Sequence, residues 1–121
     1  MAAIRYFVKD VDASLKFYER LGFELVDRWG PPFAIVRSQD LELWLSGPGT
    51  SAAKPMPDGR TPESGGWNRI VVEVSELPVL FETLKNSGII FRNEPVSGPG
   101  GTQVVVDDPD GNPIELFEPR N

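Results

Sequence analysis

The side chains that could perform chemistry in this chain are carboxylates and an arginine, because histidine and cysteine are both absent. Glu42, Arg69, Glu73 and Glu115 all fall in segments where apolar and polar residues alternate, as expected for strands. Without imidazole or thiolate, no serine or cysteine nucleophile has a histidine partner, and carboxylates alone make a poor site for zinc, nickel or iron. What these residues can support is a base whose pKa is raised by burial, or an ion pair.

Aromatic residues accompany these charges. Trp44 shares a predicted strand face with Glu42, and Trp67 follows a stretch rich in Pro, Gly and Ser. Flat rings in a cavity can stack on a planar ligand and can hold a cation. A solvated sheet surface is the alternative for this face, and packing at a dimer interface is the alternative for both tryptophans. We predict that the ligand-binding residues are Phe7, Phe33, Glu42, Trp44, Trp67, Arg69, Glu73 and Glu115.

A repeated pattern must position these residues. Each copy predicts a strand, an acidic helix cap, an amphipathic helix, a glycine that stops the helix and a new strand. The first copy contains Val8, Asp10, Val11 and Gly22, which recur at a constant offset as Val74, Glu76, Leu77 and Gly88. The chain is therefore interpreted as a tandem duplication of one module.

The predicted order of elements is βαβββ twice, which is an α+β fold. In the first copy we expect a helix from Asp10 or Asp12 to about Leu21 and strands over residues 3–8, 23–28, 33–38 and 41–46. In the second copy we expect a helix over residues 77–87 and strands over residues 67–74, 89–96, 102–107 and 113–117. One domain, 1–121, would then contain a first module at 1–47, a linker rich in Pro and Gly at 48–66, and a second module at 67–121.

Charge and hydropathy exclude several classes of partner. The net charge of −6 and the lack of clustered Lys and Arg argue against nucleic acid. No segment has the roughly 18 apolar residues of a membrane span, and the N-terminus does not look like a secretory signal. We expect a cytoplasmic protein with no membrane partner. Its acidity would favour a cationic or neutral ligand, or would serve solubility alone.

Two motifs give the chain a resemblance to the vicinal oxygen chelate superfamily, which includes glyoxalase I, extradiol dioxygenases and bleomycin-resistance proteins. They are VKDVDASLKFYERLGFEL, with its echo in the second half, and DDPDGNPIELFEP. The resemblance implies a cupped, barrel-like mixed sheet with the helices outside, often in a homodimer. Its metal-ligand positions fall on Ala3, Glu42, Arg69 and Glu115. Alanine cannot bind a metal and a guanidinium repels one. We therefore expect no metal or other cofactor, and an ion pair of Arg69 with Glu115 or Glu42.

The resemblance is greatest to the metal-free, bleomycin-resistance type, whose members sequester a drug between aromatic side chains in an acidic dimer crevice. It implies a binding protein for an aromatic or cationic small molecule that acts in antibiotic or toxin resistance. Two other hypotheses stay open. One is a metal-independent lyase or isomerase with Glu42, Glu73 or Glu115 as base, and the other is a catalytically inactive scaffold or regulatory domain.

Overall fold

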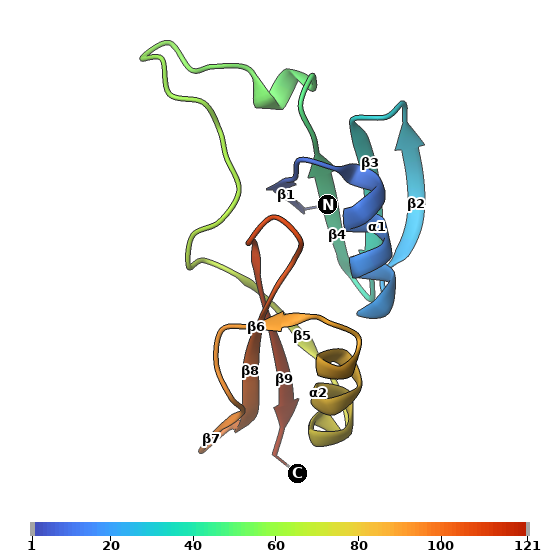
Figure 1. Ribbon diagram of the computed structural model, residues 1–121, viewed down its shortest axis with the longest axis vertical. Coiled ribbons are helices and arrows are strands. Elements are labelled where there is room, and N and C mark those ends of the chain that lie inside the picture. Colours follow the sequence, from blue (N-terminus) through green and yellow to red (C-terminus); the bar gives the residue numbers. More distant parts are fainter. Residues whose placement is uncertain (1, 121) are drawn as a thin grey trace. The chain divides into compact units, whose positions relative to one another are not determined.

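The computed structural model describes residues 2–120. The chain divides into two compact units, of which the first ends at Ser64 and the second begins at Gly65. Each unit combines one helix of ten residues with one mixed sheet, as Figure 1 shows. The predicted α+β class is confirmed. Within residues 2–120, neither helix is long and apolar enough to cross a membrane.

The first unit has the predicted βαβββ order. Its sheet follows the order β1-β4-β3-β2, in which β1 runs parallel to β4 and the other neighbours are antiparallel. The sheet is therefore open, with β1 and β2 as its outer strands. A short 3-10 helix, η1 (Ser51–Ala53), follows. The other elements are β1 (Ala3–Phe7), α1 (Val11–Arg20), β2 (Glu24–Trp29), β3 (Phe33–Ser38) and β4 (Leu41–Ser46).

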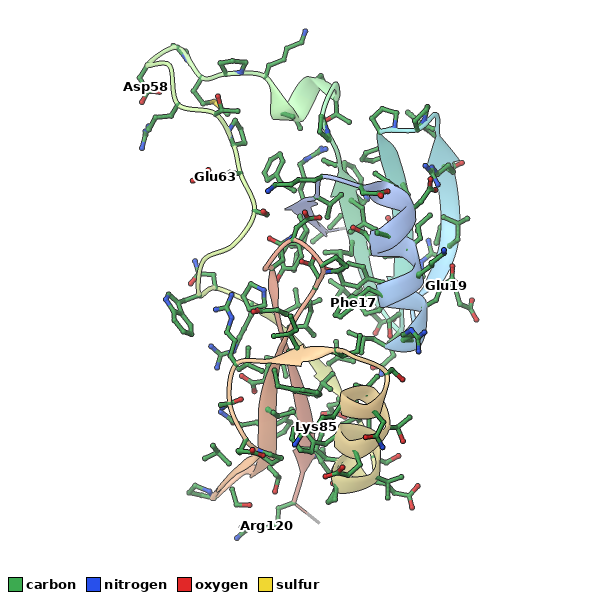
Figure 2. The ribbon with its side chains drawn as sticks, in the orientation of Figure 1. Phe17, Glu19, Asp58, Glu63, Lys85 and Arg120 are labelled. Carbon is green, nitrogen blue, oxygen red and sulfur yellow. The ribbon has the colours of Figure 1, made fainter. Side chains whose placement is uncertain are left out.

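Helix α1 begins and ends at the residues that its capping pattern indicates. The Asp10 carboxylate accepts a hydrogen bond from the Ala13 amide at 3.3 Å, so Asp10 and not Asp12 is the N-cap. Gly22 follows the helix with φ 92°, a conformation that L side chains rarely adopt. Figure 2 shows Phe17 and Glu19 on this helix, of which Phe17 is buried and Glu19 is exposed. The buried face consists of Val11, Ser14, Leu15, Phe17 and Tyr18.

The side chains of strand β4 point alternately into the core and to the opposite face of the sheet. Leu43 and Leu45 are fully buried in the core, and α1 packs against β4. Side chains alternate along a strand, so Glu42 and Trp44 point the other way. The predicted division of this strand into an apolar face and a face of charged and aromatic residues is confirmed.

The second unit has the sheet order β5-β9-β8-β6, with β7 also paired to β8. As in the first unit, its first strand is parallel to its last. The elements are β5 (Ile70–Glu73), α2 (Leu77–Asn86), β6 (Ile90–Phe91), β7 (Val96–Gly98), β8 (Gly101–Asp107) and β9 (Pro113–Pro119).

The single strand predicted over residues 89–96 is wrong, because β6 and β7 are separate. Pro95 lies between them and has no N–H to donate to a ladder. The Asn93 side chain instead accepts a hydrogen bond from the Val105 amide at 2.9 Å, while the Arg92 amide donates to the Val105 carbonyl at 2.9 Å. A side chain thus replaces the main chain where the strand is interrupted.

The strand predicted over residues 67–74 begins only at Ile70. Its partner in the parallel ladder is Ile114, and β9 itself begins at Pro113. Residues 67–69 therefore have no partner strand on this side. Trp67 consequently lies outside the sheet.

The cap of α2 also differs from the expectation. Glu76 occupies the N-cap with φ 53°, and its side chain makes no capping hydrogen bond. The carboxylate of Glu118, on β9, accepts hydrogen bonds from the amides of Glu76 and Leu77 at 2.8 and 3.0 Å. The sheet thus supplies the anionic cap that the sequence pattern assigned to the helix itself.

Candidate functional site

Three aromatic side chains of the first unit lie together. The Phe33 ring is 6.1 Å from the Trp44 ring at 82°, and 6.0 Å from the Trp29 ring at 59°, measured between centroids. The strand register explains this cluster. Trp29 on β2 is directly opposite Phe33 on β3, and Trp44 lies on the next strand, β4. Edge-to-face and tilted pairs of this kind are favourable for aromatic rings.

Arg5 adds a cation to the aromatic cluster. Its guanidinium carbon lies 5.1 Å from the Trp44 centroid and 6.0 Å from the Phe33 centroid, both within the range of a cation–π interaction. Arg5 Nη1 donates a hydrogen bond to Ser46 Oγ at 2.8 Å. Within residues 2–120, Arg5 forms no ion pair with a carboxylate. The rings and the serine therefore hold a positive charge that is not paired with any carboxylate of the described residues.

These residues border a hollow of about 340 Å³, which we call the aromatic hollow. Its volume is within the range of sites that bind small molecules. The lining combines one guanidinium, three aromatic rings, one proline and two hydroxyls, and it contains no carboxylate. It consists of Arg5, Trp29, Pro32, Phe33, Trp44, Thr50 and Ser51.

Glu42 is directed to an arginine rather than to a ligand. It lies opposite Arg37 across β3 and β4, and Arg37 Nη2 donates to Glu42 Oε2. Trp44 Nε1 makes a longer hydrogen bond of 3.4 Å to Glu42 Oε1. These two hydrogen bonds, Arg37 first, lower the pKa of Glu42. A raised pKa was one possibility for a catalytic base, and it is wrong for this residue.

In the second unit, the predicted ion pair of Arg69 with Glu115 is confirmed. Arg69 Nε and Nη2 lie 3.0 and 2.9 Å from Glu115 Oε1, so both nitrogens contact the same oxygen. Glu115 is 9% exposed. The guanidinium therefore satisfies a largely buried carboxylate.

The four positions that the resemblance assigned to metal ligands do not fit a divalent metal. Ala3 is the strand neighbour of Glu42, and Arg69 is the ion-pair partner of Glu115. Each carboxylate is bound to an arginine, and Ala3 offers no donor atom. Among residues 2–120, no three side chains of His, Cys, Asp or Glu gather closely enough to bind a metal ion.

Trp67 packs against another arginine of the second unit. The guanidinium carbon of Arg92 is 4.6 Å from the Trp67 centroid, and Trp67 as a residue is 73% exposed. Arg92 also binds Asp107 at 2.6 Å and donates to the carbonyls of Gly66 and Gly111 at 2.8 and 2.9 Å. This arginine joins the start of the unit to the turn before β9. Glu73, on β5, is exposed.

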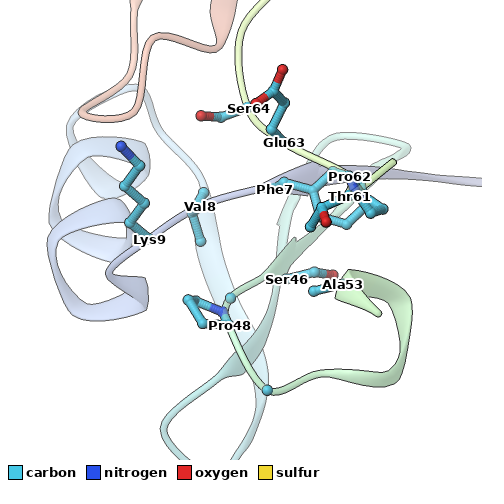
Figure 3. Close-up of a pocket in the computed structure, with 12 residues that line it drawn as sticks. Phe7, Val8, Lys9, Ser46, Pro48, Ala53, Thr61, Pro62, Glu63 and Ser64 are labelled. Atoms are coloured by element: carbon cyan, nitrogen blue, oxygen red, sulfur yellow. The ribbon is translucent and has the colours of Figure 1, made fainter. Parts of the chain in front are cut away.

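Phe7 lines a different hollow, shown in Figure 3, with a volume of about 480 Å³. Lys9 and Glu63 supply its charges, and Phe7 is the one aromatic residue of its lining. Most of the remaining lining comes from residues 46–49 and 61–64 of the first unit. Ser46, which accepts the hydrogen bond from Arg5, borders this hollow too.

The structure thus brings Phe33, Trp44 and Glu42 together in the first unit, and Arg69 and Glu115 in the second. Arg5 was not among the predicted ligand-binding residues. Its signal was present in the sequence, because strand alternation already places it on the same face as Phe7. The pairing of Arg37 with Glu42 also had a signal, because the two-residue turn Gln39-Asp40 between β3 and β4 sets these two residues opposite each other.

Comparisons with known proteins agree with this architecture. The sequence model of one protein family, the Glyoxalase/Bleomycin resistance protein/Dioxygenase superfamily, matches residues 1–116 of this chain. A solved member of that superfamily from Sphaerobacter thermophilus DSM 20745 is 29% identical, with a TM-score of 0.74 and 98% of each chain covered. The search of curated proteins finds no match.

Two further structures show the range of relatives. TnmS3, an antibiotic binding protein from Streptomyces sp. CB03234, is 25% identical, with a TM-score of 0.70 and coverage of 99% of this chain and 97% of that one. Lactoylglutathione lyase from Agrobacterium tumefaciens is 19% identical, with a TM-score of 0.73 and coverage of 98% and 92%, and it shares the fold. From the match over nearly its whole length, the chain belongs to the Glyoxalase/Bleomycin resistance protein/Dioxygenase superfamily.

Proposed function

We propose that this protein binds a planar aromatic small molecule in the aromatic hollow and sequesters it, as an antibiotic or toxin resistance protein would. The observation that carries the proposal is the arrangement of Trp29, Phe33 and Trp44 around a hollow of about 340 Å³. Each ring that stacks on a ligand contributes roughly 0.5 to 1.5 kcal/mol beyond the burial of area.

Membership of the superfamily supports the proposal, because one solved neighbour is described as an antibiotic binding protein. The state of Glu42 and Glu115 supports binding over catalysis by either of these residues. Glu42 is held ionised by Arg37, and Glu115 is paired with Arg69. No carboxylate lines the aromatic hollow. A lyase or isomerase that uses one of these acids as its base would first have to break an ion pair.

The proposal includes a homodimer in the cytoplasm. The outer strands β2 and β5 carry exposed apolar side chains, with Leu25 at 49%, Val26 at 43% and Val71 at 53%. Unpaired strand edges with apolar residues are suited to contact with a second copy. Sedimentation analysis at micromolar concentration tests this part, and a monomer would contradict it.

Titration calorimetry with naphthamide, a neutral two-ring aromatic, tests the binding function. We expect saturable binding, and recovery of unchanged naphthamide after long incubation. Trp44→Ala should weaken binding by about 1 to 3 kcal/mol, which corresponds to about 5- to 150-fold. Trp67→Ala is the matched comparison, because its ring belongs to the second unit. If Trp67→Ala loses as much affinity for naphthamide as Trp44→Ala, Trp67 also contributes to the binding site, as the sequence predicted.

Two results would contradict the proposal. The first is a Trp44→Ala variant that binds as tightly as the wild type, since the hollow would then not be the site. The second is the formation of a product by the wild-type protein that continues in the presence of a chelator, which would favour the lyase or isomerase. For the resistance role, expression in a susceptible bacterium should raise the tolerated dose of a planar aromatic antibiotic, and Trp44→Ala should abolish this protection.

A further inference from the structure

We infer that the ligand of the aromatic hollow is an anion: a planar aromatic molecule with a carboxylate, sulfonate or phenolate beside its ring, recognised by Arg5. The inference rests on the proposed function and specifies its ligand class. It differs from the cationic or neutral ligand that the acidic composition favoured.

The position of Arg5 is the first argument. Its guanidinium already lies over the Trp44 and Phe33 rings, at 5.1 and 6.0 Å from their centroids. A ligand cation would therefore compete for ring faces that a protein cation uses, and it would be repelled at the same time. A ligand anion would instead be attracted by this guanidinium.

The charge of the lining is the second argument. Arg5 is the one charged residue among the seven that border the hollow. The nearby acid Glu42 does not compensate it, because its two oxygens accept hydrogen bonds from Arg37 and Trp44. The chain as a whole carries −6. Those distant charges are screened over about 8 Å at physiological ionic strength, so the local cation dominates inside the hollow.

The donors of Arg5 are the third argument. A guanidinium has five N–H groups. Within residues 2–120, Arg5 donates one hydrogen bond, to Ser46 Oγ at 2.8 Å. Ser46 is 1% exposed, so the acceptor is fixed in place. The anchored guanidinium can offer its other donors to a carboxylate or sulfonate with little further loss of freedom. Thr50 and Ser51 add hydroxyl groups to the lining.

A matched series of ligands tests the inference. Naphthoate, naphthamide and naphthylmethylammonium, all substituted at the same ring position, differ chiefly in charge. We expect calorimetry near neutral pH to show that naphthoate binds about tenfold more tightly than naphthamide and that the ammonium binds most weakly. Arg5→Gln should abolish the preference for naphthoate while naphthamide still binds. Arg20→Gln, an exposed arginine at the end of α1, removes the same charge elsewhere and should keep the preference.

Each outcome distinguishes the inference from the proposed function. If naphthamide or the ammonium binds as tightly as naphthoate, the inference is overturned while the binding function stands. The assignment to Arg5 is overturned if Arg5→Gln keeps the preference, or if Arg20→Gln loses it equally. If none of the three compounds shows saturable binding, the proposed function itself is contradicted. Near-ultraviolet circular dichroism of both variants shows whether the fold is retained.

Discussion

Arg5 and Trp44 are neighbours on the parallel strands β1 and β4, and the guanidinium carbon of Arg5 lies 5.1 Å from the centroid of the Trp44 ring. The pair combines a permanent charge with a large apolar surface. Ser46, two residues after Trp44 on the same face, holds the guanidinium from the side. Strand pairing alone therefore builds the recognition element of the proposed site.

Ser46 is predicted to position Arg5 without contacting the ligand. Ser46→Ala removes the acceptor and lets the guanidinium move, so naphthoate should bind about three- to fivefold more weakly. Binding of naphthamide should not change, and Ser46→Thr, which keeps a hydroxyl, should restore the affinity for naphthoate. Calorimetry measures all three. Equal losses for both ligands would indicate damage to the hollow rather than a positioning role.

The ion pair of Glu42 with Arg37 is predicted to make stability depend on pH. The pKa of Glu42 is lowered in the folded state, so its contribution is present above the ordinary value of 4.5 and is lost as pH falls through the lowered folded-state pKa. Glu42→Gln removes this contribution. Thermal melts should therefore separate wild type from variant near neutral pH and converge in acid. A difference in Tm that stays constant with pH would show that Glu42 does not titrate in this way.

Loss of Arg69 is predicted to leave Glu115 with an uncompensated charge. Arg69→Met should lower the free energy of unfolding by about 1 to 3 kcal/mol, because the carboxylate is only 9% exposed. Glu115→Gln in the Arg69→Met background removes that charge and should recover part of the loss. Urea denaturation of the two single variants and the double variant measures the coupling. Additive effects would mean that the ion pair contributes nothing.

Helix α2 offers a test of its unusual cap. Glu118→Ala deletes the carboxylate that accepts from the amides of Glu76 and Leu77, and it should cost about 1 kcal/mol of stability. Glu76→Ala is the matched control, since the Glu76 side chain makes no capping bond. We expect that variant to unfold within about 0.5 kcal/mol of wild type in urea. If Glu76→Ala instead destabilises the protein more than Glu118→Ala, the Glu76 side chain provides the cap.

Much of the fold follows from local patterns. The bounds of α1 are predictable because Asp10 and Gly22 act on amides and dihedral angles within a few residues. Strands β3 and β4 match their expected ranges, since alternation of apolar and polar residues is a local signal. The same alternation separates Trp44 and Glu42 from Leu43 and Leu45. It also puts Arg5 on the face where the aromatic hollow forms.

The contacts that define the site depend on register between segments far apart in the chain. Arg5 meets Trp44 only because β1 and β4 pair at one offset out of several that the alternation allows. Glu118 caps α2 because β9 places its carboxylate beside the start of that helix. Such meetings carry no short-range signal in the sequence. The charge of the hollow therefore follows from the packing of one basic residue, although the composition of the chain is acidic.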